Sequence, residues 1–223
     1  MKPTLSVDYS LNSTGLCLYY RSTFHYASLL NLTPLNKREK TLLEQLKSVV
    51  SIFPYERHAV LSAQHQGLSQ WEREHMGNVL RLNAKFTDDI VSFLSTFGLK
   101  LSGVSVILEN YSHTTQTNTI IQLIENTFCL KRNLFDAGLS IEDFYIVPAP
   151  VVKKFAGSGA YDKFQMLSAF LQLSDIDDAF QSFCLEHRDS LYVQKTKRNE
   201  VLTPISDLVD AFWLNKFFQD SVQ

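Results

Sequence analysis

The chain has 223 residues, of which 45% are hydrophobic and 20% charged, and its formal net charge is −2 at pH 7. This length fits one large α/β domain, or one domain that carries an insertion. The composition excludes a disordered, collagen-like or low-complexity protein, and no apolar run approaches the ~18–20 residues of a membrane span. The net charge offers no global attraction for nucleic acid, so phosphate binding would require local basic patches.

The cysteines Cys17, Cys129 and Cys184 lie far apart and form no CxxC pair. This spacing argues against a disulfide scaffold or a zinc ribbon and is typical of a protein of the reducing cytoplasm. We therefore expect each cysteine to pack as a small apolar residue.

The N-terminal third is predicted to begin with three short strands at 4–7, 15–20 and 24–30, and turn-forming residues 8–15 join the first two in a hairpin. From Pro34 the apolar spacing becomes helical and predicts a helix that ends near Pro54. That spacing is formed by Leu42, Leu43, Leu46, Val49 and Val50. A second helix is predicted over 69–97. Its apolar stripe consists of Trp71, Met76, Val79, Leu80, Phe86, Ile90, Val91 and Leu94.

The second half of the chain alternates between strands and helices. The predicted elements are a buried strand at 104–108, a helix at 118–135, a strand at 144–147, a helical turn at 151–155, a helix at 162–173, a polar mixed segment at 174–201 and a last helix from Thr203-Pro204 to about Gln219. The order predicts an α/β fold with an antiparallel front half and βα alternation behind it.

Acidic residues stand at the ends of two of the predicted buried strands. Asp8 closes the first strand and Glu109 closes the fourth, while Asp207 and Asp210 lie one turn apart on the last helix and share a face. A carboxylate at the end of a core strand is costly unless it is paired or binds a metal ion. If these acids converge, their oxygen atoms would suit Mg²⁺ or Mn²⁺. Two such ions roughly 3.5–4 Å apart could clamp both sides of a phosphodiester.

Each acid also has an ordinary structural explanation. Asp8 precedes Ser-Leu-Asn-Ser and could be a turn residue, and Glu109 could be a surface acid. Asp207 and Asp210 could complement the dipole at the start of their helix. Only the placement of the four residues as a set favours a metal site.

Four segments of the sequence resemble the RuvC-like Holliday junction resolvases of the RNase H-like superfamily. The segments are Leu5-Ser-Val-Asp8-Tyr-Ser-Leu-Asn-Ser-Thr-Gly15, Val106-Ile-Leu-Glu109-Asn, Pro148-Ala-Pro-Val-Val-Lys-Lys154-Phe-Ala-Gly-Ser-Gly-Ala-Tyr-Asp-Lys163 and Asp207-Leu-Val-Asp210-Ala211. The third segment is the most specific. The likeness covers about residues 1–33 and 101–219.

The resemblance implies a single RNase H-like nuclease domain over 1–223, with a mixed sheet of three antiparallel strands followed by βα units. It also implies a homodimeric, Mg²⁺-dependent endodeoxyribonuclease that acts on branched DNA such as a four-way junction, in DNA recombination or repair, with Mn²⁺ as a substitute metal. Asp8, Glu109, Asp207 and Asp210 would then be the catalytic metal ligands for two ions. Asp8 would bridge both ions, Glu109 and Asp210 would each bind one, and Asp207 would be an additional ligand or would hold a metal-bound water.

The chain departs from the family pattern in three places. The first motif has Tyr9-Ser10-Leu11 where bacterial members carry a glycine, residues 36–100 form a predicted helical insertion, and the 174–201 segment is unusual. These departures point to a phage or viral member, in the cytoplasm of a bacterial or infected host cell.

Basic and aromatic residues supply candidate DNA contacts. Lys153, Lys154 and Lys163 surround Gly157-Ser-Gly159 just before a helix, where backbone and helix N–H groups could approach a phosphate; the alternative is a solvated turn. Further candidates are Tyr111 as a base-stacking aromatic and Lys195, Lys197 and Arg198 as a basic loop. A rim-packing tyrosine and a solvated surface loop are the ordinary alternatives.

The helix at 118–135 carries apolar residues on more than one face, namely Ile120, Ile121, Leu123, Ile124 and Phe128. Such a helix must bury more than one of its faces. Either a second copy of the chain covers the outer face, or the 36–100 insertion does.

Two other functional classes remain open from the sequence. An actin-like or sugar-kinase phosphotransferase shares the fold core, but that group needs a duplicated domain of about 350 residues or more. A catalytically silent DNA-binding or structural protein is the other class, because fold similarity does not establish activity.

Overall fold

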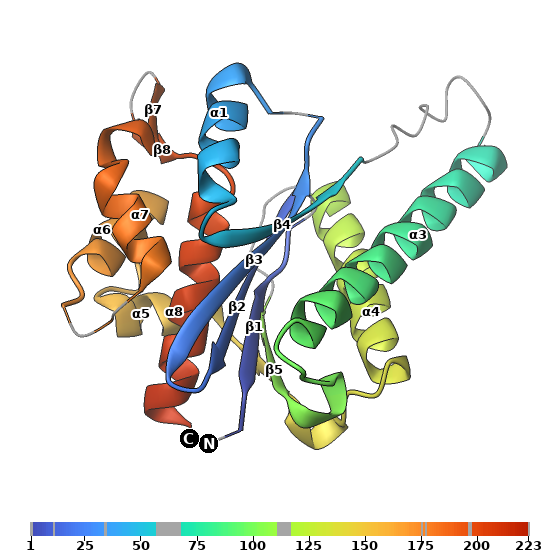
Figure 1. The fold of residues 1–223 in the computed structure, drawn as a ribbon. Helices are drawn as coiled ribbons and strands as arrows, with labels where there is room; N and C mark the ends of the chain where they lie inside the picture. The colour runs from blue at the N-terminus through green and yellow to red at the C-terminus, as the bar shows by residue number, and fades with distance from the viewer. Residues whose placement is uncertain are drawn as a thin grey trace.

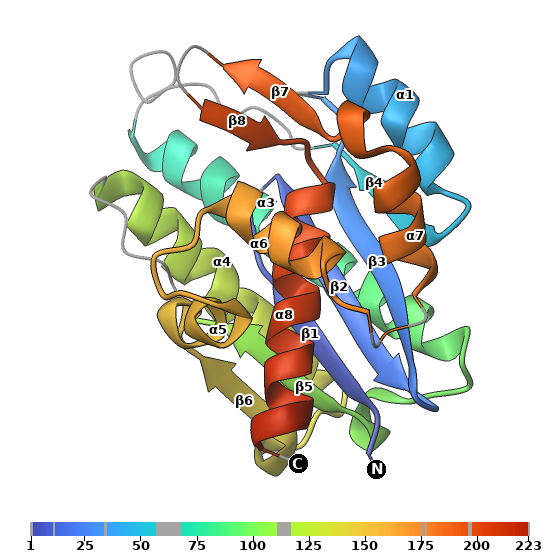
Figure 2. The same ribbon diagram turned by 90° about the vertical axis from the view of Figure 1, so that its left-hand side faces the viewer.

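The structure is a computed structural model that describes residues 2–10, 12–33, 35–56, 68–110, 117–174, 176, 178–195 and 198–222. A six-stranded sheet lies at its centre in the order β4-β3-β2-β1-β5-β6 (Figures 1 and 2). The strands are β1 (Thr4–Asp8), β2 (Ser13–Tyr20), β3 (Thr23–Asn31), β4 (Val50–Tyr55), β5 (Ser105–Glu109) and β6 (Phe144–Val147). Strands β1 to β3 pair antiparallel, whereas β4 pairs parallel with β3, β5 with β1 and β6 with β5. The predicted fold class, three antiparallel strands followed by βα units, is confirmed.

Helices cover both faces of this sheet. They are α1 (Lys37–Leu46), α3 (Leu68–Ser95), α4 (Thr117–Asp136), α5 (Ala149–Ala156), α6 (Lys163–Leu171), α7 (Ala179–Glu186) and α8 (Ile205–Ser221), with short 3₁₀ turns at Leu101–Gly103, Ile141–Asp143 and Arg188–Ser190. Helices α5 to α8 lie on one face, and α3 and α4 lie on the other (Figure 1). A two-stranded sheet of β7 (Tyr192–Lys195) and β8 (Arg198–Val201) precedes α8.

The prediction of one helix that ends near Pro54 is wrong at its C-terminal half. Helix α1 ends at Leu46, and Val50–Tyr55 forms the strand β4 beside β3, with Leu30 opposite Pro54. The apolar spacing of residues 50–55 fits either a helix or a strand. The segment forms a strand because the edge of β3 is available for pairing. Pro54 is tolerated because β4 is an edge strand and need not donate from every residue. The 36–100 segment therefore contains a strand of the main sheet as well as helices.

Two further predictions need correction. Helix α3 forms as expected, but Met76, Leu80 and Val91 of the predicted apolar stripe are exposed. The 174–201 segment, predicted as polar and mixed, contains α7 and the β7–β8 pair. Asp178 caps α7 by accepting a hydrogen bond from the Gln181 amide, and this cap is the local signal that the sequence prediction missed.

Other expectations hold for the described residues. The three cysteines are buried and free of disulfides. None of the described helices combines the length and the apolar character that a membrane crossing requires.

Helix α8 lies directly on β1 and β2 (Figure 2). A Cβ atom built on Gly15 of β2 would overlap the backbone carbonyl of Asp207 and would lie 2.9 Å from the amide nitrogen of Leu208. Only glycine therefore permits the first turn of α8 to approach the sheet this closely.

Buried polar contacts fix α8 on these strands. The Ser6 hydroxyl donates a hydrogen bond to the Ala211 carbonyl at 2.6 Å, and the Asn215 side-chain amide donates to the carbonyls of Cys17 at 2.7 Å and Thr4 at 2.9 Å. An unpaired buried amide costs about 1–3 kcal/mol. These bonds therefore oppose sliding or rotation of α8, and they set which of its side chains face the end of β1.

We predict that Gly15→Ala destabilises the protein by about 3 kcal/mol, because the new methyl group must displace the backbone of α8. Chemical denaturation measures this change. Gly103→Ala is the matched control, since a Cβ atom there meets no atom within 4 Å. Both substitutions reduce the entropy of the unfolded chain in the same way. Equal stabilities of the two variants would contradict the close contact at Gly15.

Candidate functional site

Four acids from three separate elements meet at one edge of the main sheet. Strands β1 and β5 run parallel with Val7 opposite Leu108, so Asp8 and Glu109 leave the sheet at the same edge. Asp8 pairs with Gly15, against which the backbone of Asp207 lies. Asp210 follows one turn later on α8. The convergence expected from the sequence is therefore present in the fold.

Burial and mutual repulsion disturb the ionisation of these acids. Burial raises the pKa of Asp8 well above its ordinary value, and the neighbouring acids raise it further, Glu109 most strongly. Burial also raises the pKa of Glu109, although a hydrogen bond with Asp8 opposes the rise. The pKa of Asp210 rises to about 7, mainly because of burial, while the charge of Lys163 opposes this shift. The folded chain therefore favours the protonated form of these three carboxyl groups.

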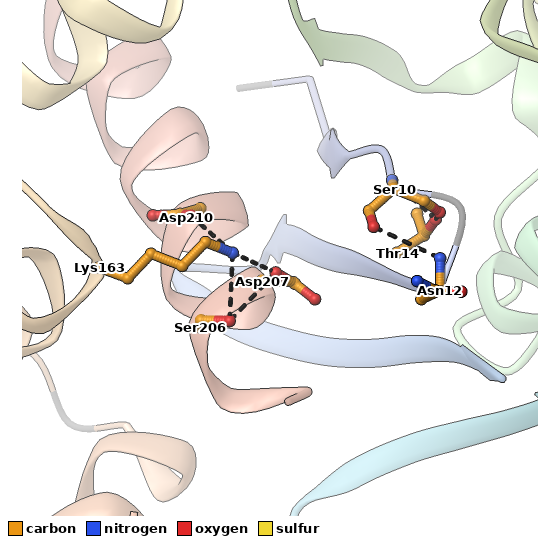
Figure 3. Close-up of polar contacts among 7 residues, drawn as sticks. All are labelled: Ser10, Asn12, Thr14, Lys163, Ser206, Asp207 and Asp210. Atoms are coloured by element: carbon orange, nitrogen blue, oxygen red, sulfur yellow. Dashed lines mark hydrogen bonds and ion pairs between the residues drawn. The ribbon is translucent and has the colours of Figure 1, made fainter. Parts of the chain in front are cut away.

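Lys163 brings a positive charge into the cluster (Figure 3). Its Nζ atom lies 2.6 Å from Oδ1 of Asp207 and 3.7 Å from Oδ2 of Asp210. It also donates a hydrogen bond to the Ser206 hydroxyl at 3.2 Å, and that hydroxyl lies 3.1 Å from Oδ1 of Asp207. Desolvation alone would lower the pKa of Lys163, but the charges of the neighbouring aspartates raise it above its ordinary value.

The local sequence explains where Lys163 points. The Asp162 side chain caps α6 by accepting a hydrogen bond from the backbone N–H of Gln165 at 2.9 Å, and the Gln165 side-chain oxygen accepts one from the backbone N–H of Asp162 at 2.9 Å. Lys163 is therefore held at the first position of the helix. A cation is disfavoured there by the helix dipole, so its partners on α8 must offset that cost.

The turn after Asp8 is held by its own polar groups (Figure 3). The Thr14 hydroxyl donates to the Ser10 carbonyl at 3.0 Å. The side chain of Tyr9 lies on the face of the sheet that α3 and α4 cover. There its hydroxyl donates a hydrogen bond to the Asn83 side chain of α3 at 3.2 Å. Asn83 in turn donates to the side chain of Asn126 on α4 at 3.0 Å. Tyr9, which follows Asp8, is thus hydrogen-bonded to α3 and, through Asn83, linked to α4.

The predicted basic contacts divide into three groups. Lys153 and Lys154 lie in the last turn of α5, and the charge of Lys153 acts on both Glu109 and Asp210. Gly157 ends α5 with a φ of 152°, a conformation that favours glycine. Lys163 contacts the acids, as described above. The third group lies outside what the structure describes: Tyr111 and Lys197 entirely, and the side chains of Lys195 and Arg198.

Ser206 is a site residue that the sequence analysis missed. It is buried and bridges Lys163 and Asp207. A serine near the start of a helix is an ordinary sequence feature, so no local signal distinguishes it. Only the approach of α6 to α8 shows its position.

The donor chemistry of the cluster fits a divalent cation, since its acids offer only oxygen ligands. As the side chains stand, however, no group of three or more His, Cys, Asp or Glu in the described part of the chain is arranged to hold a metal ion. The ammonium of Lys163 lies between Asp207 and Asp210 (Figure 3). Metal binding at these acids would therefore require side-chain rearrangement.

No protein-family model matches the chain, and no curated protein matches it. Among solved structures, a Thermus thermophilus RuvC structure is similar at a TM-score of 0.42 with 11% identity, over 98% of this chain and 95% of that one. T. thermophilus RuvC in complex with a Holliday junction substrate gives a TM-score of 0.39 with 10% identity, over 100% of this chain and 97% of that one.

The raised pKa of Asp210 gives a testable pH dependence in metal-free protein. Between about pH 4 and pH 7 the folded state binds more protons at this group than the unfolded state, so stability falls as the pH rises through this window. We predict that Asp210→Asn removes this loss and stabilises the protein above pH 7, by at most about 4 kcal/mol, with no gain below pH 4. Thermal or denaturant unfolding in EDTA measures the difference.

Asp136→Asn serves as the control, because Asp136 is an exposed acid on α4 with only a surface ion pair to Arg132. Because an exposed ion pair contributes at most about 1 kcal/mol, this substitution should change stability little. An Asp210→Asn variant whose stability parallels that of wild type at every pH would contradict the raised pKa.

Proposed function

We propose that this protein is a divalent-metal-dependent endonuclease that cuts branched DNA, of the type of the RuvC-like Holliday junction resolvases. The observation that carries the proposal is the convergence of Asp8, Glu109, Asp207 and Asp210 from β1, β5 and α8 at one edge of the sheet. Strongly perturbed carboxylates gathered in this way are typical of functional sites.

The four acids would serve as the metal ligands, with Asp8 between two ions, Glu109 and Asp210 on one ion each, and Asp207 in a supporting position. Mg²⁺ or Mn²⁺, when bound, would activate a water for in-line attack and neutralise charge on the phosphate and the leaving oxygen. The chain itself contributes rigidity: Gly15 and Asn215 hold α8 against the strands, so that the backbone that carries the helix acids is fixed beside the strand ends. Such pre-positioning lowers the cost of reaching the reactive geometry.

The DNA backbone would approach through the basic residues beside the acids. Lys153 lies close enough to influence Glu109 and Asp210 electrostatically, and Lys154 is exposed on the same turn of α5. We propose that both contact phosphates on either side of the scissile bond, together with Tyr111, Lys195, Lys197 and Arg198. These contacts would position the substrate without reading its sequence. A role in recombination or repair and a phage or viral origin belong to the same proposal.

We further propose that the protein acts as a homodimer through α4. Helix α3 packs beside α4, where His75 lies 2.9 Å from Glu125 and Asn83 bonds to Asn126. Yet Ile121, Ile124 and Phe128 of α4 are 48%, 46% and 67% exposed. The described residues of the 36–100 insertion thus leave these three side chains uncovered, which supports a second copy of the chain as their partner. A second copy of the chain would bury these three exposed side chains of α4. The two-fold symmetry of such a dimer would match the two scissile phosphates of a four-way junction.

We predict that Asp8→Asn, Glu109→Gln and Asp210→Asn each abolish cleavage of four-way-junction DNA, because each removes one ligand charge while keeping the side-chain shape. Binding to the same DNA should persist. Gel assays of cleavage with MgCl₂ and with EDTA, and binding assays in CaCl₂, measure the two properties separately.

The control is Asp136→Asn, a neutralised acid distant in sequence from the site, which should cleave as wild type does. Binding of junction DNA by the wild-type protein without any cleavage in MgCl₂ or MnCl₂ would favour the silent DNA-binding alternative. Wild-type cleavage by any one of the three variants would remove that residue from the ligand set.

For the dimer, we predict that Ile121→Glu combined with Ile124→Glu yields a folded monomer that loses paired cuts on a junction. The charges disrupt an intermolecular contact and not the core, because both side chains are about half exposed in one chain. Sedimentation at micromolar concentration and circular dichroism measure assembly and folding. Ile141→Glu is the control, since Ile141 is 66% exposed outside α4. Sedimentation of the wild type as a monomer, with and without junction DNA, would contradict the dimer.

A further inference from the structure

We infer that Lys163 is an internal counter-ion that a divalent metal ion must displace from Asp207 and Asp210, so that this lysine sets the metal affinity of the site. The inference rests on the proposed function, because it concerns the same acids. It concerns a step before catalysis, the exchange of one cation for another, and it assigns to Ser206 the role of a positioning residue that holds the lysine in place.

The first observation is the geometry of the ammonium group. Its Nζ atom lies 2.6 Å from Oδ1 of Asp207 and 3.7 Å from Oδ2 of Asp210. Figure 3 shows it between the two carboxylates. An oxygen atom that accepts from an ammonium at this distance is not free to bind a metal ion, and two cations repel each other strongly at such separations. Lysine and metal ion therefore compete for these oxygens.

The second observation is that the lysine can leave without unfolding the protein. The side chain of Lys163 is 53% exposed, whereas those of Asp207 and Asp210 are only 7% and 16% exposed. The ammonium thus reaches from the solvent side to acids that are fixed on α8. Rotation of a half-exposed, flexible lysine disturbs no core contact. The α8 backbone that carries the acids stays in place while their counter-ion changes.

The third observation is the bridge made by Ser206. Its hydroxyl accepts a hydrogen bond from Lys163 at 3.2 Å and lies 3.1 Å from Oδ1 of Asp207. Ser206 is buried, so its position does not depend on solvent. The bridge adds a neutral partner to the ion pair and favours the lysine-bound arrangement over the open one. Loss of this hydroxyl should therefore favour the metal ion without changing any charge.

The test is the affinity of DNA-free protein for MnCl₂, measured by calorimetric titration at pH 8 together with the rise in melting temperature in MgCl₂. Lys163→Met keeps the length and apolar stem of the side chain but removes the ammonium. We expect this variant to bind Mn²⁺ at least about tenfold more tightly than wild type, equivalent to about 1.4 kcal/mol. Its melting temperature should also rise more in MgCl₂.

Two further variants distinguish the direct contact of Lys163 with the acids from the long-range effect of a nearby positive charge. Lys153→Met removes another positive charge that acts on Glu109 and Asp210 but makes no ion pair with them among the described contacts. It should change Mn²⁺ affinity less than about threefold. Ser206→Ala keeps every charge and should tighten Mn²⁺ binding about threefold, the effect of losing one ordinary hydrogen bond.

Equal Mn²⁺ affinities of wild type and Lys163→Met would overturn the inference while leaving the proposed function intact. Equal gains in Lys163→Met and Lys153→Met would also overturn it, because long-range charge would then explain the effect. If Lys163→Met does not fold, an unchanged affinity in Ser206→Ala overturns the inference. Absence of binding in wild type and in every variant would overturn both the inference and the proposed metal site.

Discussion

The backbone of α8 at Asp207 lies against Gly15 of β2 with no side chain between them. Because Gly15 pairs with Asp8 in the β1–β2 ladder, this one contact brings the acids of a helix near the end of the chain to the acid of its first strand. The buried bonds of Ser6 and Asn215 hold the helix in that position. The site therefore depends on a backbone approach that only a glycine allows, and the remaining features of the cluster follow from it.

Gathering these acids costs stability. The raised pKa values of Asp8, Glu109 and Asp210 mean that the folded chain, without a metal ion, favours protonated carboxyl groups that would be ionised in the unfolded chain. Lys163 at the first position of α6 is likewise disfavoured by the helix dipole. Each feature is unfavourable locally, and the ion pair between Lys163 and Asp207 offsets part of both costs. Natural proteins retain such conflicts chiefly at sites where they are used.

The segment between β3 and β5 is integrated with this site. Strand β4 extends the main sheet, and α3 supplies Asn83, which links Tyr9, next to Asp8, to Asn126 of α4. Asn83 and Asn126 are buried, so the network is protected from competing water. One connected set of hydrogen bonds thus runs from the strand end that carries Asp8 to the helix that exposes Ile121, Ile124 and Phe128. The segment therefore supports the end of β1 through the contact between Asn83 and Tyr9.

The sequence by itself determined the elements whose signals are local. The hairpin around Gly15, the strand that ends in Glu109 and the helix that carries Asp207 and Asp210 follow from residue periodicity and turn chemistry. Asp8 and Glu109 stand out because they end strands, and Asp207 and Asp210 because they share one face of a helix. Tertiary structure decided what depends on distant partners. Val50–Tyr55 became a strand because β3 offered a free edge, and Ile121 and Ile124 stayed exposed because α3 packs on a different side of α4. Lys163 became a partner of Ser206 and Asp207 because α6 lies beside α8. Periodicity records which face of an element is apolar, but the partner of that face is set by contacts between residues far apart in the chain.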